Sequence, residues 1–589
     1  MLTERHGEKM SNSSHSLTTD VLVIGTGIAG LFAAMRAKEM GADVLVVEQG
    51  ESGFSGLSVG GTHRLRPVLP EDDFDEIMKA EVRENEYLVD QDFQESALRE
   101  TWDRIQDLVS FGADFRRGDD GQIKMYYNDT LYPEYKQKNI CWEPMGSYKH
   151  LLKVKTETIR RGVKILDKVL AVELLKSKGK IQGAAAFNLI NGDFYLLKAK
   201  AVIIATGGFC GGGSVYQSLT GDGIAMALQA GAELRNMEFG KAETCGMPIR
   251  GAGPRWISRL LNPQEQEITV TNSKGEEFLE KYELGRRMEG RKPYGPPFRV
   301  ELAAMFQEIK EGNGPCYIDF RAPDKESRMR EFWGSYNDRL VTEVRLTGVS
   351  LDKIKYELGL VFGHCQAGGI KISPNGESSI AGLYAGGVAT DLCGVMQYTV
   401  LSGMMGSMIT GRRAGESAAR YTNDQSEVMI DEEQLESVKR EMFAPIEHKQ
   451  GISADEIRLK AQKAWLNIDL RTQARLEKAM EEFQELRKEA SDIVAQDYHE
   501  LAKCHKIKNY LYCSEAVAAA ALGRQETRLE HIRLDYPLTD NKEWLKWVIV
   551  HLEQDKIKSY LENLPMERWK YKPEPTVENR LRLKEGTSL

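Results

Sequence analysis

Residues 20–35 read DVLVIGTGIAGLFAAM, and residues 44–50 read VLVVEQG. The apolar run at 21–24 is typical of a strand that is buried on both faces of a parallel sheet. Three glycines follow it directly, residues 31–40 have the composition of a helix, and 44–47 form a second apolar run. Strand, glycine turn, helix and strand in this order predict the βαβ unit of a Rossmann-like domain.

The three glycines have separate predicted roles. Gly25 makes the tight turn, Gly27 lets the backbone approach a pyrophosphate, and Gly30 lets the helix pack on the strand. The helix N-terminus supplies free N–H groups and positive partial charge for the pyrophosphate. Glu48, at the end of the second strand, can accept hydrogen bonds from a ribose. The unit therefore predicts a dinucleotide site, and a glycine turn in a cofactor-free α/β unit is the alternative.

Small residues continue after Glu48, over positions 50–61. A loop with so little side-chain bulk can lie flat against a ring system while its N–H groups face phosphate. Because it directly follows the ribose-binding acid, we expect Ser55, Gly60 and Gly61 to contact the cofactor. The alternative is a flexible surface loop.

Composition and charge exclude several classes of protein. A chain of 589 residues predicts two or three domains. The net charge of −9 argues against nucleic-acid binding, and no apolar run is long enough to predict a membrane span. Residues 1–16 lack the apolar core of an export signal, so they predict a disordered tail and a cytoplasmic protein. The eight cysteines are scattered without a Cys-x-x-Cys pair, so no iron–sulfur, zinc or other metal site is predicted in this chain.

Two later segments return the chain to the nucleotide. A buried strand ends in Thr206-Gly207-Gly208, and Thr220-Gly221-Asp222-Gly223 opens a helix. Asp222 lies near the helix N-terminus, so it is at least an N-cap and also a candidate cofactor contact.

With the N-terminal glycine motif, these two segments resemble the flavoprotein subunit of fumarate reductase and succinate dehydrogenase. That superfamily also includes L-aspartate oxidase and the adenylylsulfate reductase alpha subunit. The resemblance covers most of the chain and implies FAD as the nucleotide. It implies an α/β fold in which an FAD-binding Rossmann-like domain (17–235 and 355–425) is interrupted by an α+β capping domain (236–354). A C-terminal helical domain with a tail (430–589) follows.

The resemblance also assigns two catalytic residues. Arg299 falls where the family places the arginine that delivers a proton to the substrate double bond, and a fixed positive charge suits that role. His364 falls where the family has a histidine that holds an oxygen of the ligand. The alternatives are a surface arginine and a structural histidine.

The segment 380–387 resembles the family's late strand. Residues 402–411 form a predicted helix of small residues whose N-terminus would face the flavin and stabilise negative charge on it. The complete set of predicted cofactor-binding residues is Gly25, Gly27, Ile28, Ala29, Gly30, Glu48, Gln49, Ser55, Gly60, Gly61, Thr206, Gly207, Asp222, Gly387 and Ser402.

The sequence departs from the family where a dicarboxylate would bind. Glu243-Thr244-Cys245 stands where the family has His-Pro-Thr, and Gln397-Tyr398-Thr399 stands near the position of a later arginine. Val388 occupies the position of a glutamate that contacts FAD. Because a buried carboxylate without a partner is costly, this pocket is poorly matched to a dianion. Glu243, Cys245 and Tyr398 are therefore predicted to bind a mono-acid, a larger conjugated acid or an unusual enoate rather than plain fumarate.

Phe54 stands where some members carry a histidine bonded covalently to FAD, so non-covalent FAD is predicted. The predicted reaction is hydride transfer between flavin N5 and an activated carbon–carbon double bond of a small-molecule substrate. Because the sequence holds neither a second nucleotide motif nor a cluster motif, an iron–sulfur or ferredoxin-type partner is expected. The alternatives are an adenylylsulfate reductase-like protein, an aspartate oxidase-like amine oxidase and a non-enzymatic electron-transfer protein.

Overall fold

The computed structural model describes residues 13–54, 56–60, 64–128, 137–141, 147–211, 219–240, 246–249, 253–256, 269–278, 305, 308–309, 311–319, 355–357, 368–392, 399–469, 471–529 and 531–579. Seven of the predicted site residues lie outside these ranges, namely Ser55, Gly61, Glu243, Cys245, Arg299, His364 and Tyr398.

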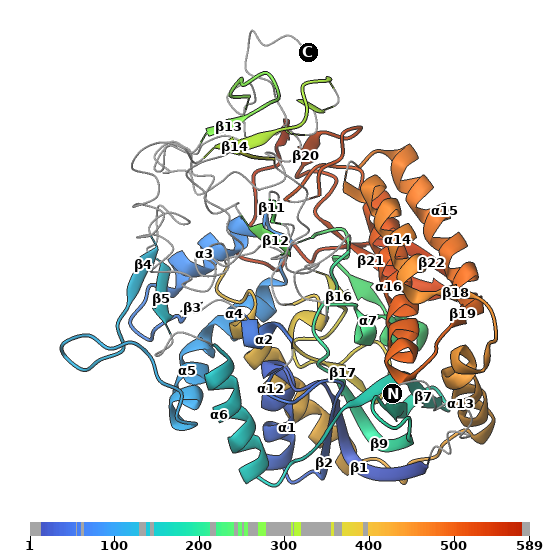
Figure 1. Ribbon diagram of the computed structural model, residues 1–589. Coiled ribbons are helices and arrows are strands. Elements are labelled where there is room, and N and C mark those ends of the chain that lie inside the picture. Colours follow the sequence, from blue (N-terminus) through green and yellow to red (C-terminus); the bar gives the residue numbers. More distant parts are fainter. Residues whose placement is uncertain are drawn as a thin grey trace.

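A seven-stranded sheet in the order β6-β2-β1-β9-β8-β7, with β17 also beside β9, underlies the N-terminal half of the molecule (Figure 1). Its strands are β1 (Ser14–Ile24), β2 (Val44–Glu48), β6 (Lys164–Asp167), β7 (Val169–Ser177), β8 (Lys180–Asn188), β9 (Phe194–Ile204) and β17 (Leu383–Ala385). Strands β6, β2, β1, β9 and β17 pair in parallel, whereas β7 and β8 form an antiparallel hairpin that pairs with β9. The predicted α/β fold is confirmed.

Strand β1 is longer than its apolar run. It begins at Ser14, and Ser14 to Ser16 pair with residues 194–196 of β9. The predicted tail is therefore wrong for residues 14–16, because backbone pairing rather than burial places them in the sheet. Strand β9, which leads to the Thr206-Gly207-Gly208 segment, runs without interruption over Phe194–Ile204.

Two helices explain why parts of the sequence are rich in small residues. Helix α1 (Ile28–Glu39) packs against α12 (Met404–Asn423). A Cβ atom at Gly411 would lie 2.2 Å from the carbonyl oxygen of Ala29, and one at Gly415 would lie 2.2 Å from that of Ala33. The small residues of α12 are thus required by close helix packing as well as by any role at the flavin.

A second sheet connects distant parts of the chain in the order β16-β10-β21-β22. Its strands are β10 (Leu234–Arg235), β16 (Gly369–Ile370), β21 (Lys546–Glu553) and β22 (Lys556–Asn563). Strand β10 leads into the predicted capping segment, and β16 follows it. Strand β10 pairs with β21 of the C-terminal hairpin on one side and with β16 on the other.

The C-terminal region begins with helices and ends with strands. The helices are α13 (Glu432–Glu447), α14 (Ala454–Asp469), α15 (Gln473–Glu489) and α16 (Tyr498–Gly523), and they lie together at the right of Figure 1. Strands β20 (Leu538–Asp540), β21, β22 and β23 (Val577–Asn579) follow them. The predicted helical domain is thus helical in its first part, whereas the contiguous apolar run 547–550 forms the buried part of strand β21.

In the predicted capping segment, the described strands are β11 (Gly246–Ile249), β12 (Gly253–Trp256), β13 (Thr269–Thr271) and β14 (Tyr317–Asp319). Strand β15 (Tyr356–Glu357) pairs with β14. This pairing places the end of the capping sheet beyond the predicted boundary at residue 354.

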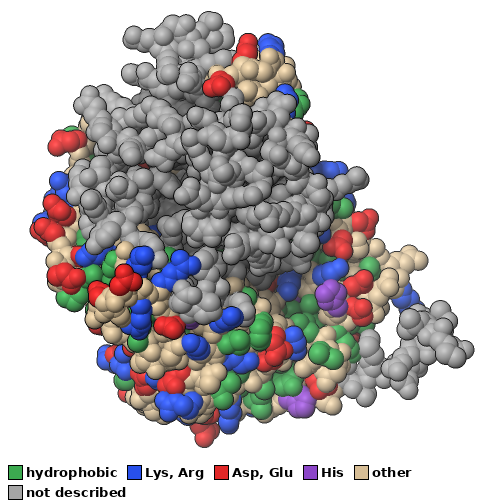
Figure 2. All heavy atoms as spheres, turned by 60° about the vertical axis from the view of Figure 1, so that its left-hand side comes forward, with side chains coloured by type: hydrophobic (Ala, Val, Ile, Leu, Met, Phe, Trp, Pro, Cys, Tyr) green, Lys and Arg blue, Asp and Glu red, His purple; other side chains and the backbone are tan. Residues whose placement is uncertain are grey.

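The remaining described elements surround the large sheet. They are α2 (Leu57–Gly60), α3 (Phe74–Glu84), α4 (Gln91–Arg99), α5 (Thr101–Ser110), α6 (Ser147–Arg160), α7 (Asp222–Gln229), β3 (Arg64–Leu65), β4 (Tyr126–Asn128), β5 (Gln137–Cys141), β18 (Ile452–Ser453), β19 (Ile493–Val494), and the 3-10 turns Gly387–Ala389 and Ala490–Asp492. On the face shown in Figure 2, acidic and basic side chains are interspersed.

Among the helices that the structure describes, none combines the length and apolar character needed to cross a bilayer.

Candidate cofactor site

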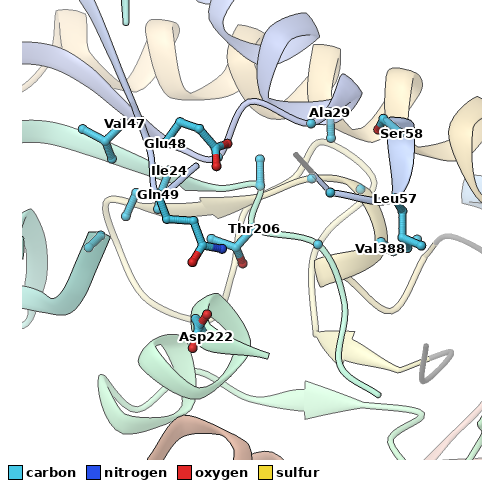
Figure 3. Close-up of a pocket in the computed structure, with 18 of the residues that line it drawn as sticks. Ile24, Ala29, Val47, Glu48, Gln49, Leu57, Ser58, Thr206, Asp222 and Val388 are labelled. Atoms are coloured by element: carbon cyan, nitrogen blue, oxygen red, sulfur yellow. The ribbon is translucent and has the colours of Figure 1, made fainter. Parts of the chain in front are cut away.

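A pocket lies at the carboxyl ends of β1, β2 and β9 (Figure 3). Ten predicted cofactor-binding residues line it: Gly25, Gly27, Ile28, Ala29, Glu48, Gln49, Thr206, Gly207, Asp222 and Gly387. Segments far apart in the sequence therefore meet at one edge of a parallel sheet, where α/β folds bind ligands.

The glycine motif has the geometry that its spacing predicted. Gly25 has a φ of +106°, and a Cβ atom there would lie 2.5 Å from the carbonyl oxygen of Ala205. At Gly30, a Cβ atom would lie 2.0 Å from the carbonyl oxygen of Gly25. Gly27 differs, because the nearest atom to its Cβ position is Ser58 Oγ at 3.7 Å. Gly25 and Gly30 are required by packing, whereas Gly27 leaves open space on the pocket side.

Glu48 is held in one position at the end of β2. Its Oε2 accepts hydrogen bonds from Thr26 N at 2.9 Å and Thr26 Oγ1 at 2.7 Å, and its Oε1 accepts one from Gly50 N at 2.8 Å. The residue is 5% exposed. A carboxylate oxygen has room for two hydrogen bonds, so Oε1 keeps the capacity to accept another from a bound ligand.

Two polar side chains in the pocket lack partners. Gln49 Oε1 and Thr206 Oγ1 are buried and have no hydrogen-bond partner among the residues that the structure describes. In Figure 3 they lie near each other, between Glu48 and Asp222. Because a buried polar atom without a partner is costly, both atoms are suited to bind polar groups of a ligand. The pocket thus fits a dinucleotide, which offers hydroxyl, phosphate and amino groups.

Asp222 is the first residue of α7, and Gly221 is the N-cap. Its Oδ2 accepts a hydrogen bond from Thr220 Oγ1 at 2.8 Å, and its Oδ1 accepts one from Asn509 Nδ2 at 3.1 Å. The N-cap interpretation is therefore wrong, since Gly221 occupies that position without a side-chain bond. The carboxylate lies at the pocket, opposite Glu48 (Figure 3).

Three predicted residues with described positions do not line the pocket. Gly30 packs beneath the turn, Gly60 ends α2, and Ser402 precedes α12, whose N-cap is Gly403. Phe54 is 55% exposed and is likewise absent from the pocket wall.

The pocket also includes residues that the sequence analysis did not assign to it. Ser58 Oγ accepts a hydrogen bond from the N–H of Ile28 at 3.2 Å, at the first turn of α1. Ser407 lies in the first turns of α12, and Val388 follows Gly387. The small-residue composition around Ser58 and Ser407 was a usable signal. The apolar wall residues Val169, Leu170, Ala171, Leu219 and Met226 carried no such signal, because they resemble any other core residue.

Comparison with known proteins gives two family matches. A model described as "FAD binding domain" matches residues 20–404, and one described as "Fumarate reductase flavoprotein C-term" matches residues 465–578. The chain is 26% identical over 562 residues to a CoM/CoB fumarate reductase subunit of Methanothermobacter marburgensis, covering 91% of this chain and 97% of that protein. It is 26% identical over 580 residues to the succinate dehydrogenase flavoprotein subunit of Rickettsia bellii, covering 91% and 93% of the two chains.

Solved structures share the fold. Mycobacterium smegmatis Sdh1 in complex with UQ1 matches with a TM-score of 0.81 and 24% identity, over 94% of this chain and 96% of that chain. An adenosine-5-phosphosulfate reductase in complex with sulfite matches with a TM-score of 0.75 and 19% identity, over 95% and 98%.

Proposed function

The chain belongs to the fumarate reductase and succinate dehydrogenase flavoprotein family, and we propose that it acts on an activated double bond of a carboxylate substrate other than plain fumarate. It is an FAD-dependent oxidoreductase of the CH–CH class. The observation that carries the proposal is the change at 243–245 and 397–399, where the sequence lacks the histidine and arginine expected of a dicarboxylate site.

The pocket residues have distinct proposed tasks in holding FAD. Glu48 accepts hydrogen bonds from the ribose, and the open space at Gly27 admits the pyrophosphate beside the first turn of α1. Gln49 and Thr206 supply hydrogen-bonding atoms that have no partner among the described residues. Bound FAD supplies hydride exchange with carbon, which no side chain provides.

The proposed proton and substrate chemistry belongs to the chain's own residues. Arg299 delivers a proton to the carbon of the double bond that does not exchange hydride, and its charge also orients a carboxylate. His364 donates a hydrogen bond to the carbonyl oxygen that activates the double bond. Both roles rest on the family resemblance, since both residues lie outside the described part of the chain.

The substrate class follows from charge. A dianion needs two cationic partners in a dry site, and here Glu243 adds a negative charge where the family has a histidine. Because an unpaired buried carboxylate is costly, a substrate with one carboxylate and a larger apolar or conjugated part is favoured. Cys245 and Tyr398 are proposed to contact that part.

Electrons must reach the site from outside this chain. We propose an iron–sulfur or ferredoxin-type partner, because the sequence holds neither a Cys-x-x-Cys pair nor a second dinucleotide motif. The relatives from Methanothermobacter and Rickettsia are themselves named as subunits, which supports a multi-subunit enzyme.

The test is an anaerobic stopped-flow experiment on dithionite-reduced protein. Fumarate, a mono-enoate such as crotonate, a cinnamate-type acid and adenylylsulfate are each added, without excess reductant, while flavin reoxidation is followed by absorbance. We expect the mono-acids to reoxidise the flavin faster than fumarate. Faster reoxidation by fumarate would contradict the proposed substrate class, and amine-dependent release of peroxide in a separate aerobic assay would favour an amine oxidase.

Adenylylsulfate reduction is the second candidate, because the same loss of a dicarboxylate clamp permits it. Reoxidation by adenylylsulfate and by none of the other compounds would support it.

The role of Arg299 in the favoured enoate reaction is tested by substitution. Arg299→Ala should abolish reoxidation by the enoate while the protein keeps its FAD. Arg291→Ala, in the same segment of the sequence but without an assigned role, is the matched control and should retain activity.

A further inference from the structure

The carboxylate of Asp222 is held from outside its own domain. Asp222 is 7% exposed and lines the pocket, so the hydrogen bonds to its two oxygens set where the remaining lone pairs point. One bond is local, from Thr220 Oγ1 to Oδ2 at 2.8 Å. The other comes from Asn509 Nδ2 to Oδ1 at 3.1 Å, from a residue 287 positions later on α16.

Asn509 is itself held in one orientation. It is 6% exposed, and its Oδ1 accepts a hydrogen bond from Gln229 Nε2 at 3.3 Å. Gln229 also donates to the carbonyl oxygen of Ala225 at 3.2 Å, one turn earlier on α7. Because the Oδ1 of Asn509 faces this donor, its Nδ2 faces Asp222.

A second contact fixes α16 against the same turn. Cys513, one helical turn after Asn509, donates from its Sγ to the carbonyl oxygen of Gly221 at 3.5 Å. Gly221 has a φ of +75°, and a Cβ atom there would lie 2.6 Å from the Cys513 Sγ. Helix α16 therefore lies directly against the start of α7 (Figure 1), and a larger residue would not fit between them.

We propose that Asn509 is a positioning residue for the cofactor, through its hydrogen bond to Asp222. The C-terminal helix thereby sets FAD affinity at a site built by the N-terminal sheet. The inference rests on the proposed placement of FAD against Asp222.

The decisive variant is Asn509→Asp, which keeps the size of the side chain and replaces the donor by a carboxyl. At low pH the introduced carboxyl is protonated and can donate to Asp222, as the amide does. At high pH the two adjacent buried carboxylates repel each other, and Asp222 is displaced. Among the described residues, the Cys513 thiol is a second titratable group near Asp222, and burial and the Asp222 charge raise its pKa well above the ordinary value, so it remains neutral.

The measurement is the Kd of apoprotein for added FAD, from quenching of flavin fluorescence, at about pH 5.5 and about pH 8.5. We expect Asn509→Asp to bind FAD about tenfold more weakly than the parent protein at the higher pH and within about threefold of it at the lower pH. The thermal midpoint of the apoprotein is measured alongside. The control is Ser514→Ala, which removes a fully buried hydroxyl of α16 that bonds Trp465 Nε1 at 3.0 Å and does not face the pocket.

Ser514→Ala should lower the thermal midpoint without changing FAD affinity or its pH dependence. A pH-independent Kd for Asn509→Asp, equal to that of the parent protein, would overturn the inference. If Asn509→Asp does not fold, Gln229→Leu, which removes the group that orients the amide, provides the test and should weaken FAD binding by about threefold. Asp222→Asn separates the two proposals: if it leaves FAD affinity unchanged, the cofactor placement itself is wrong.

Discussion

Two buried polar regions of the molecule differ in how completely their groups are paired. In the C-terminal arginine cluster, formed by Arg524, Glu526 and Arg528, Glu526 accepts four hydrogen bonds. Three come from the two arginines at 2.7 to 2.9 Å, and one comes from Asp540 N at 3.0 Å. In the cofactor pocket, by contrast, Gln49 Oε1 and Thr206 Oγ1 have no partner among the described residues.

This difference indicates a structural role for the arginine cluster and a ligand-binding role for the cofactor pocket. A carboxylate with four partners has no capacity left for a ligand, so the arginine cluster stabilises the packing of the C-terminal region. Unpaired polar atoms that line a pocket are suited to bind a ligand there. The sheet edge is therefore the better candidate for cofactor binding, although the arginine cluster contains more charge.

The largest effect is expected at Glu526. Glu526→Leu would remove three hydrogen bonds from two fully buried guanidinium groups, leaving Arg524 with Glu238 and Arg528 with Glu86, and losing one partner of a buried pair costs about 3–5 kcal/mol. The urea midpoint of the apoprotein should fall accordingly, while the folded fraction should keep its FAD affinity. Glu553→Leu removes an exposed carboxylate paired with Lys558 and should change the midpoint little. A loss of FAD affinity in Glu526→Leu would contradict the division between the two regions.

Acid should destabilise the C-terminal region through its buried histidines. Burial lowers the pKa of His505 to about 4, and burial together with the charges of Arg471 and Arg524 lowers the pKa of His531 well below its ordinary value. Since the unfolded chain binds these protons near pH 6.5, stability falls as the pH drops from 6.5 toward 4.

His505 alone contributes a loss on the order of 2 kcal/mol by about pH 5. Thermal midpoints of the apoprotein at neutral and acid pH measure it. His505→Gln, whose amide can still donate to the carbonyl oxygen of Met442, should lose part of this pH dependence. An unchanged slope would contradict the assignment.

Gly27→Ala should separate cofactor binding from folding. Gly27 has a φ of −60° and a ψ of 171°, which alanine adopts freely, and the nearest protein atom to the new Cβ is 3.7 Å away. The methyl group would occupy the space proposed for the pyrophosphate, so FAD affinity should fall about 100-fold, or about 2.7 kcal/mol. Apoprotein stability should not change, as thermal shift and FAD titration together can show.

Gly25→Ala is the comparison for that variant. Its methyl group would contact the carbonyl oxygen of Ala205 in a backbone conformation that alanine avoids, so it should lower apoprotein stability as well. Equal effects of the two substitutions on stability would contradict the distinction drawn from the pocket geometry.

The smallest effect is expected at Thr206. Thr206→Val replaces a buried hydroxyl without a described partner by a methyl group of similar size. The apoprotein should become more stable by about 1 kcal/mol, and FAD should bind about fivefold more weakly. The thermal midpoint should therefore rise without FAD and change little at saturating FAD, because fivefold weaker binding costs about 1 kcal/mol. A destabilised apoprotein would indicate that the hydroxyl already has a partner.

Much of the pocket was predictable because its signals are local. Gly25 and Gly30 have the turn and packing geometry that was predicted, since backbone turns depend on neighbouring residues and glycine alone tolerates a φ such as that of Gly25. Gly27 leaves the space that its predicted role requires. Glu48 was predictable for the same reason, because its place at the end of a strand follows from the length of the βα unit. These features needed no knowledge of the rest of the chain.

Other assignments failed where the deciding contact is distant. The N-cap role of Asp222 was wrong because Gly221 takes that position and Asn509, on another helix, donates to the carboxylate. The role of the small residues of α12 was incomplete, since Gly411 and Gly415 are required by the backbone of α1.

Local sequence predicted the βαβ unit and its glycine turn, because periodicity and backbone conformation are properties of short stretches. FAD as the cofactor followed from the resemblance of several such stretches to a flavoprotein family. Folding in three dimensions established which buried polar atoms remain without partners and which helix supports Asp222. Those outcomes depend on packing between segments hundreds of residues apart, and such packing leaves no pattern in either segment alone.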